Sequence, residues 1–201
     1  DKLNFKKFFV AGHDRGGRVA HRMARDFRKK ILALSVLDIC PTLDMYEKTN
    51  EKFAKSYFHW FFLIQPAPLP ERMIMNNPRK WIKNCLDKWS GNHKFGSVEE
   101  AYLKSFKQKK RLHASCEDYR ASATIDLEHD KKDRNKKLNI PIQILWGKRG
   151  VIGKQFNSKK IWQRFSNKKV YGYGINSGHF IPEQNPKQTI IQLKNFFLKQ
   201  I

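Results

Sequence analysis

The chain is poor in cysteine, and its cysteines lie far apart. Cys40, Cys85 and Cys116 form no CxxC pair, so the sequence indicates neither a disulfide framework nor a zinc site, and a reducing compartment is expected. No apolar run approaches the roughly 20 residues that span a bilayer, and no secretion signal is recognisable. The sequence therefore predicts a soluble, cytoplasmic protein without a membrane partner.

Acidic residues are scarce as well. Eighteen Asp and Glu stand against 41 Lys and Arg, which gives a net charge of +23. An excess of this size can indicate a nucleic-acid partner. The lysines, however, are spread along the chain in pairs, and the abundance of Lys, Asn, Ile and Phe is typical of an AT-rich genome. We therefore expect a solvated basic surface and no nucleic-acid partner, with nucleic-acid binding as an alternative.

The length of 201 residues, with 40% hydrophobic residues, suits one domain with room for an insertion. Apolar runs predict strands at residues 8–11 and 31–37 with a helix at 15–29 between them, which makes a parallel β-α-β unit. The later pattern predicts a strand at 140–146, a helix at 155–166, a strand at 169–173, a loop at 174–185 and a helix from 186.

The middle of the chain differs from both ends. Residues 40–137 are rich in aromatic side chains, show no strand pattern and are interrupted by prolines, which favours short helices. The sequence thus predicts an α/β fold with a mostly parallel sheet and a helical cap. The expected divisions are a first core part at 1–39, the cap at 40–137 and a second core part at 138–201.

A glycine-flanked aspartate follows the first predicted strand. The segment Gly12-His13-Asp14-Arg15-Gly16 stands between a buried strand and a helix, which is the context of a nucleophile elbow. Glycines on both sides of Asp14 are expected to allow a turn sharp enough to present its side chain above the sheet. The alternative is that Asp14 caps the helix.

A nucleophile elbow needs a histidine base and an acid that orients it. His179 lies in a glycine-containing loop between the last strand and the final helix, where this base is expected. Residues 147–158 contain no acid, so the orienting carboxylate is predicted to be Asp38, at the end of the strand 31–37. The alternatives are a surface histidine and a capping or turn role for Asp38.

An aspartate nucleophile indicates the kind of bond that is attacked. A serine that attacked a saturated carbon would leave a stable ether, whereas a carboxylate leaves an ester that activated water can hydrolyse. The pattern therefore favours alkyl halides or epoxides as substrates. The backbone N–H of Arg15 is expected to supply one donor to the oxyanion formed during hydrolysis.

Two arginines follow the aspartate. Arg15 and Arg18 are three residues apart at the start of a helix, so both can face the space in front of Asp14, where the helix N-terminus adds positive potential. Such a pair is suited to hold a small carboxylate. The alternative is a pair of ordinary surface arginines.

The sequence closely resembles the fluoroacetate (haloacetate) dehalogenases of the α/β-hydrolase fold. The likeness spans nearly the whole chain, through "AGHDRGGRVAHRMA", "VLDICPT", "YFHWFFLIQPAPLPE", "CEDYRASA", "DLEHD" and "SGHFIPEQNP". It implies that His59, Trp60 and Tyr119 line a halide pocket, although each could equally be an aromatic residue of the core. It also implies a homodimer, no metal or organic cofactor, and the absence of roughly the N-terminal third of the family's chain.

The expected activity is hydrolytic dehalogenation of a small 2-haloacid. Asp14 attacks, Arg15 and Arg18 hold the carboxylate, and His179, oriented by Asp38, activates water. Haloalkane dehalogenases and many epoxide hydrolases are similar but carry Trp after the nucleophile, where this chain has Arg15. An epoxide hydrolase of the same fold and a basic nucleic-acid-binding protein on an inactive hydrolase scaffold remain alternatives.

Overall fold

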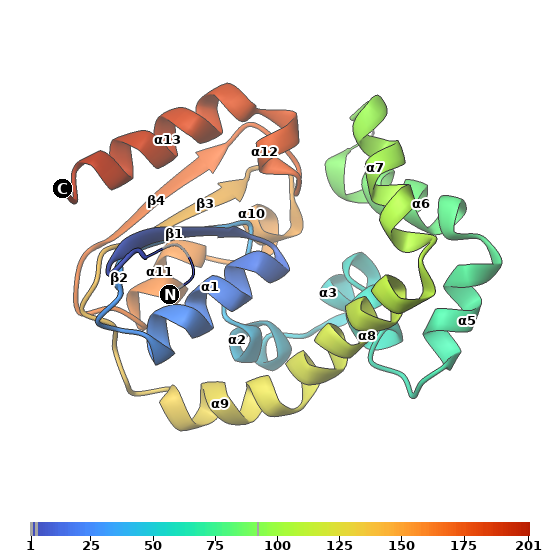
Figure 1. The fold of residues 1–201 in the computed structure, drawn as a ribbon, viewed down its shortest axis with the longest axis horizontal. Helices are drawn as coiled ribbons and strands as arrows, with labels where there is room; N and C mark the ends of the chain where they lie inside the picture. The colour runs from blue at the N-terminus through green and yellow to red at the C-terminus, as the bar shows by residue number, and fades with distance from the viewer. Residues whose placement is uncertain (1, 3, 92) are drawn as a thin grey trace.

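A parallel β-sheet forms the centre of the molecule (Figure 1). The computed structural model describes residue 2 and residues 4–91 and 93–201, and within them the sheet has four strands in the order β1-β2-β3-β4. The strands are β1 (Phe8–His13), β2 (Ile31–Leu37), β3 (Ile142–Gly147) and β4 (Val170–Ile175). Their carboxyl ends therefore lie at one edge of the sheet.

Helices connect the strands and fill the long middle of the chain. Their bounds are α1 (Arg15–Asp26), α2 (Thr42–Glu47), α3 (Glu51–Ser56), α4 (His59–Phe62), α5 (Leu69–Asn76), α6 (Pro78–Ser90), α7 (Ser97–Phe106), α8 (Lys109–Ala123), α9 (Ile125–Asp133), α10 (Val151–Gln155), α11 (Ser158–Gln163), α12 (Ile181–Gln184) and α13 (Pro186–Leu198). No described helix is long and apolar enough to cross a membrane.

The sheet is covered by helices on both faces (Figure 1). On one face, Ala20 and Ala24 of α1 and Trp162 of α11 pack with the apolar side chains of the strands. On the other face, a smaller cluster joins Leu37 and its strand neighbours to Leu193 of α13. Burial on both faces is the reason that β2 and β3 read as continuous apolar runs in the sequence.

The predicted helical insertion is present as α2 to α9, which contain no strand among the described residues. Helices α3 and α5 to α8 stand beside the sheet, whereas α9 returns beneath α1 (Figure 1). An aromatic cluster joins the insertion, through Phe53, Trp60 and Tyr119, to Ile152 and Phe165 after β3. The boundaries proposed for the cap, 40–137, and for the core parts, 1–39 and 138–201, stay predictions.

Several predicted boundaries are corrected by the structure. The helix predicted at 15–29 ends at Asp26, because the backbone leaves the helical conformation at Phe27. The helix predicted at 155–166 is the shorter α11, at Ser158–Gln163, and α10 before it was not predicted. Phe156 is extended and separates the two, and the side chain of Asn157 accepts the N–H of Lys160 to start α11. The predicted loop 174–185 contains the end of β4 and the short helix α12.

Candidate active site

Asp14 lies at the turn between β1 and α1 in a conformation that side chains rarely adopt. Its φ is 51° and its ψ is −124°, and its N–H donates to the carbonyl of Leu37 at the end of β2 (3.1 Å). Residues with a side chain avoid positive φ unless the surrounding structure enforces it, and such strain is concentrated at functional sites. The Asp14 side chain makes no capping hydrogen bond to α1, so the geometry does not support the helix-cap alternative.

Two glycines make this turn sterically possible. A Cβ at Gly12 would lie 2.2 Å from the carbonyl oxygen of Gly16, and a Cβ at Gly17 would lie 2.8 Å from the side chain of Ile39. A Cβ at Gly16 would meet no atom within 4 Å. The expectation for Gly12 is confirmed, whereas the expectation that Gly16 is needed is wrong: Gly17, buried against Ile39, is the second close approach.

Asp14, His179 and Asp38 are brought together at the carboxyl ends of the strands. The imidazole Nδ1 of His179 lies 2.7 Å from Oδ2 of Asp38, and Nε2 lies 3.9 Å from Oδ1 of Asp14. The other oxygen of Asp38 accepts the backbone N–H of Gly147 (2.9 Å). Asp38 is 1% exposed and His179 is 6% exposed, so water does not compete for this contact. The three side chains that the sequence suggests as nucleophile, base and orienting acid therefore lie together in space.

The charges of this group act on one another. Partial burial of Asp14 raises the pKa of its carboxyl, but the positive charges of His179 and Arg18 outweigh this effect, and the pKa lies below its ordinary value. Burial lowers the pKa of His179, but the hydrogen bond with Asp38 and the charge of Asp14 outweigh it, and the pKa is raised. Asp14 is therefore ionised at neutral pH, as attack by a carboxylate requires.

Arg15 and Arg18 converge on one acidic side chain. Nη1 of Arg15 lies 3.3 Å from Oδ2 of Asp118, and Nη2 of Arg18 lies 3.2 Å from the same oxygen. Arg15 also donates to the hydroxyl of Ser115 (2.8 Å). Both guanidinium groups lie over the ring of Tyr119, 5.5 and 5.3 Å from its centroid. The two arginines therefore meet at Asp118. This residue was not predicted from the sequence as part of the site.

The three residues expected around a halide are buried and adjacent. His59, Trp60 and Tyr119 are 4%, 4% and 5% exposed, and the ring of Tyr119 lies 5.5 Å from His59 and 6.2 Å from Trp60. Burial lowers the pKa of His59 to about 3, so its imidazole is neutral at physiological pH. Trp60 and Tyr119 also belong to the aromatic core cluster, so packing accounts for part of their burial.

Two aromatic residues at this site were missed in the sequence. The ring of Trp89 lies 4.4 Å from His59, and its carbonyl oxygen accepts the N–H of His179 (2.8 Å). Tyr57 lies 5.1 Å from His59 and 6.5 Å from the ring of His179. Tyr57 could have been suspected from its place in the aromatic run before His59. Trp89 gave no local signal, because its position depends on how α6 packs against the loop of His179.

Small buried groups without partners mark the same region. Within the described part of the chain, Nη1 of Arg18, Nδ1 of His59 and Nε1 of Trp89 are buried and have no hydrogen-bond partner. Buried polar groups are normally paired, so such groups call for a ligand or an ordered water. A guanidinium and an indole can only donate, and a neutral imidazole can donate from either nitrogen. Each of these atoms is therefore available to donate a hydrogen bond to a ligand.

A cavity of about 280 Å³ lies beside His179, at the ends of α3 and α6 and at α10. Four cationic side chains and no acidic one line it: Lys52, Lys88, Arg149 and Lys154. Tyr57, Trp89 and His179 also line this cavity. Its positive charge favours the entry and exit of small anions.

One group outside this region has the composition of a metal site. The ligand atoms of Glu71, His113 and Glu117, on α5 and α8, lie within 4.8 Å of one another. Arg120 donates to both glutamates, with an Nη1 to Oε1 distance of 2.8 Å for Glu71 and 2.5 Å for Glu117. The guanidinium of Arg120 already pairs with both carboxylates, and none of the residues of the elbow or the aromatic pocket belongs to this group.

Known proteins resemble the chain throughout its length. A family model described as alpha/beta hydrolase fold matches residues 1–186. A fluoroacetate dehalogenase from Burkholderia sp is 37% identical over 198 residues, which cover 96% of this chain and 64% of that protein. A soluble epoxide hydrolase from Corynebacterium sp. (strain C12) is 28% identical over 97% of this chain and 68% of its own. The structure of an alpha/beta hydrolase from Nostoc sp PCC 7120 has a TM-score of 0.93 and 44% identity, and the match covers 98% of this chain and 68% of that one.

Proposed function

Because the chain belongs to the alpha/beta hydrolase fold family, we propose that it hydrolyses a small haloacid, such as fluoroacetate, to the hydroxyacid and a halide ion. The predicted fold class is confirmed by the family match and by the TM-score of 0.93. The choice of a haloacid is supported by the 37% identity to a fluoroacetate dehalogenase. The homodimer and the absence of a nucleic-acid partner are further parts of the proposal.

One observation carries this proposal. A carboxylate, rather than a hydroxyl, stands at the elbow, and the histidine 3.9 Å from it is bonded through its other nitrogen to Asp38. In the first step, an oxygen of Asp14 attacks the carbon that bears the halogen. A C–O bond forms, the carbon–halogen bond breaks, and the halide leaves with the bonding electrons.

In the second step, water hydrolyses the ester on Asp14. Nε2 of His179 takes a proton from the water, and the resulting hydroxide attacks the ester carbonyl. The backbone N–H of Arg15 is proposed to stabilise the oxyanion. When the intermediate collapses, the hydroxyacid leaves with the proton from His179. The second proton of the water stays on the carboxyl of Asp14, whose low pKa releases it to solvent, so that Asp14 returns as a carboxylate. The hydrogen bond with Asp38 stabilises the imidazolium formed on the way.

The surroundings of Asp14 suit a carboxylated substrate. Arg15 and Arg18 converge in front of the elbow, and Nη1 of Arg18 has no partner among the described residues. We assign the substrate carboxylate to these two arginines and the departing halide to His59, Trp60 and Tyr119. Because fluoride is a poor leaving group, donors aimed at its developing charge lower the barrier of the first step.

Hydrolysis of an epoxide is the second candidate. The chain is similar to a soluble epoxide hydrolase, and the rings of two tyrosines, Tyr57 and Tyr119, lie 5.1 and 5.5 Å from the ring of His59. Burial raises the pKa of both phenols, so each keeps the proton that an opening epoxide would need. The arginine pair distinguishes the two candidates, since a neutral epoxide has no group for it.

The two reactions can be separated with the natural protein and two substrates. We expect halide and hydroxyacid to be released from fluoroacetate or chloroacetate, as measured with an ion-selective electrode and by chromatography. Styrene oxide should remain unchanged. Diol formation without halide release would favour the epoxide hydrolase. If neither reaction occurred and the protein bound random DNA in a salt-dependent manner, the inactive-scaffold alternative would replace both.

A further inference from the structure

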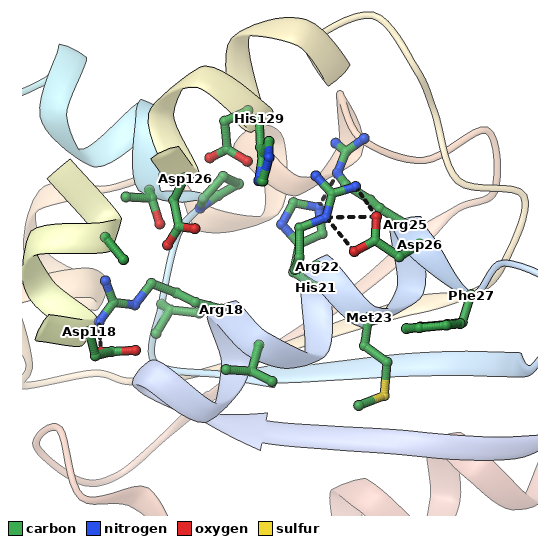
Figure 2. A pocket seen from close by; sticks show the side chains of 16 residues that line it. Arg18, His21, Arg22, Met23, Arg25, Asp26, Phe27, Asp118, Asp126 and His129 are labelled. Atoms are coloured by element: carbon green, nitrogen blue, oxygen red, sulfur yellow. Dashed lines mark hydrogen bonds and ion pairs between the residues drawn. The ribbon is translucent and has the colours of Figure 1, made fainter. Parts of the chain in front are cut away.

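Among the described residues, Asp118 is the one acidic side chain that forms ion pairs with both Arg15 and Arg18. Its Oδ2 lies 3.3 Å from Nη1 of Arg15 and 3.2 Å from Nη2 of Arg18. Figure 2 shows Asp118, on α8, next to the guanidinium of Arg18, on α1. This pair forms one end of a cavity of about 370 Å³ between α1, α8 and α9. Asp118 therefore connects the cap to the helix that begins at the elbow.

Two guanidinium groups held close together need a compensating charge. Like charges repel, and a nearby carboxylate offsets this repulsion. Two carboxylates interact with the charges of these arginines. Asp118 forms ion pairs with both, and Asp14 has a pKa that the two arginines help to lower. Among the described residues, ion pairs join the arginines to Asp118 and none joins them to Asp14. Asp118 thus satisfies the arginines while the oxygens of the nucleophile stay free to attack.

Each arginine uses only one nitrogen for Asp118. Nη1 of Arg18 is buried and has no partner in the described part of the chain, so it remains available to a ligand. Stacking on Tyr119, with Arg18 also 5.4 Å from the ring centroid of Trp60, limits the rotation of the guanidinium groups. A substrate carboxylate that binds beside the two arginines therefore meets N–H groups whose directions are already fixed. The negative charge of Asp118 repels this carboxylate.

We propose that Asp118 is a positioning residue that aims both arginines at the carboxylate of a small haloacid and keeps them from pairing with Asp14. This inference rests on the proposed function, because it names the group that orders the carboxylate-binding arginines. The proposal predicts that the negative charge of Asp118 lowers the affinity for small carboxylates and raises the rate at which Asp14 attacks the substrate. Removing that charge should therefore shift binding and chemistry in opposite directions.

Asp118→Asn tests the proposal in the natural protein, with Asp126→Asn as its matched control. Asp126 lines the same cavity and carries the same charge, but Figure 2 draws no interaction between it and an arginine. For Asp118→Asn we expect the dissociation constant of acetate to fall about fivefold, because a repulsive charge is gone. Halide release in a single turnover should slow by about tenfold, because the guanidinium groups no longer hold the substrate in line with Asp14. The control should match the parent in both.

Calorimetric titration with acetate and rapid-quench halide release from chloroacetate measure the two effects. Asp118→Glu, which keeps the charge, should bind acetate as the parent does. Weaker acetate binding in Asp118→Asn, or equal effects in Asp118→Asn and Asp126→Asn, would overturn the proposal. If Asp118→Asn did not fold, Asp118→Glu would decide. Acetate affinity equal to that of the parent, together with slower halide release, would support the proposal, and weaker acetate affinity would overturn it. A parent protein that binds acetate but releases no halide would refute the proposed function, and the acetate titrations alone would then decide the role of Asp118.

Discussion

Alanine substitutions at two glycines of the elbow are expected to have opposite effects on stability. At Gly12, the new Cβ would lie 2.2 Å from the carbonyl oxygen of Gly16 and 2.6 Å from the backbone nitrogen of Gly17, whereas ordinary contact begins at 3.4 Å. These neighbours are backbone atoms at the start of α1, so the turn itself must move. We expect a loss of about 3 kcal/mol in the free energy of unfolding, which lowers the melting temperature by roughly 6–12 °C.

Gly16→Ala is the matched control. No atom lies within 4 Å of the added Cβ, and the residue is in the first turn of α1 with φ outside the positive region. Replacing glycine by alanine at a compatible position reduces the conformational freedom of the unfolded chain and adds about 0.4–1 kcal/mol of stability. The melting temperature should therefore rise by roughly 1–4 °C.

The two variants should also differ in activity. Asp14 is attached to the turn that Gly12→Ala must displace, and a shift of the nucleophile by about 1 Å lowers the rate by roughly 100-fold. Thermal unfolding followed by circular dichroism and halide release from chloroacetate would measure both effects. The steric account of the elbow would be refuted if Gly12→Ala melted with the parent or if Gly16→Ala lost as much stability as Gly12→Ala.

Three further predictions concern the charges of the site. Activity should fall as the pH drops through the pKa of His179, because His179 must be neutral to accept a proton. The contact with Asp38 raises this pKa, so Asp38→Asn should move the acidic limb of the pH–rate profile to lower pH and reduce the plateau rate by roughly 10³- to 10⁴-fold. An acidic limb that did not move would contradict the assignment of Asp38. Arg18→Met should raise KM for chloroacetate by about tenfold or more while it leaves a neutral haloalkane unaffected, so equal changes for both substrates would exclude the carboxylate role. The double variant Lys88→Gln and Lys154→Gln should have a lower kcat/KM for haloacids at low salt and a kcat/KM equal to that of the parent at high salt, because salt screens the charge of the cavity. An equal loss at high ionic strength would argue against electrostatic attraction of the substrate by this cavity.

The sheet and the elbow could be predicted from sequence because their causes are local. Parallel strands buried on both faces appear as apolar runs, and a turn that approaches backbone closely requires glycine, as at Gly12. The contact between Asp38 and His179, 141 positions apart, could also be predicted, because the carboxyl ends of all strands of a parallel sheet lie at one edge.

Other features depend on packing that no local pattern records. Asp118 is one acid among several on α8 and α9, and only the approach of α8 to α1 distinguishes it. Trp89 reaches the site because the end of α6 lies against the loop of His179, where a Cβ at Gly178 would be 2.4 Å from the Trp89 carbonyl. The break between α10 and α11 follows from one extended residue, Phe156, whose apolar character is compatible with a continuous helix.

The proposed covalent step can be tested most directly with His179→Asn in the natural protein. Attack on the halogen-bearing carbon needs an ionised Asp14 and no base, whereas hydrolysis of the ester needs a group that takes a proton from water. Incubated with fluoroacetate, the variant should release halide equal to about one per active site and then stop. Mass spectrometry should find a carboxymethyl group on the peptide that contains Asp14, and Asp14→Asn should show neither effect. Normal turnover by His179→Asn, or an adduct on another residue, would contradict the assignment of Asp14 as the nucleophile.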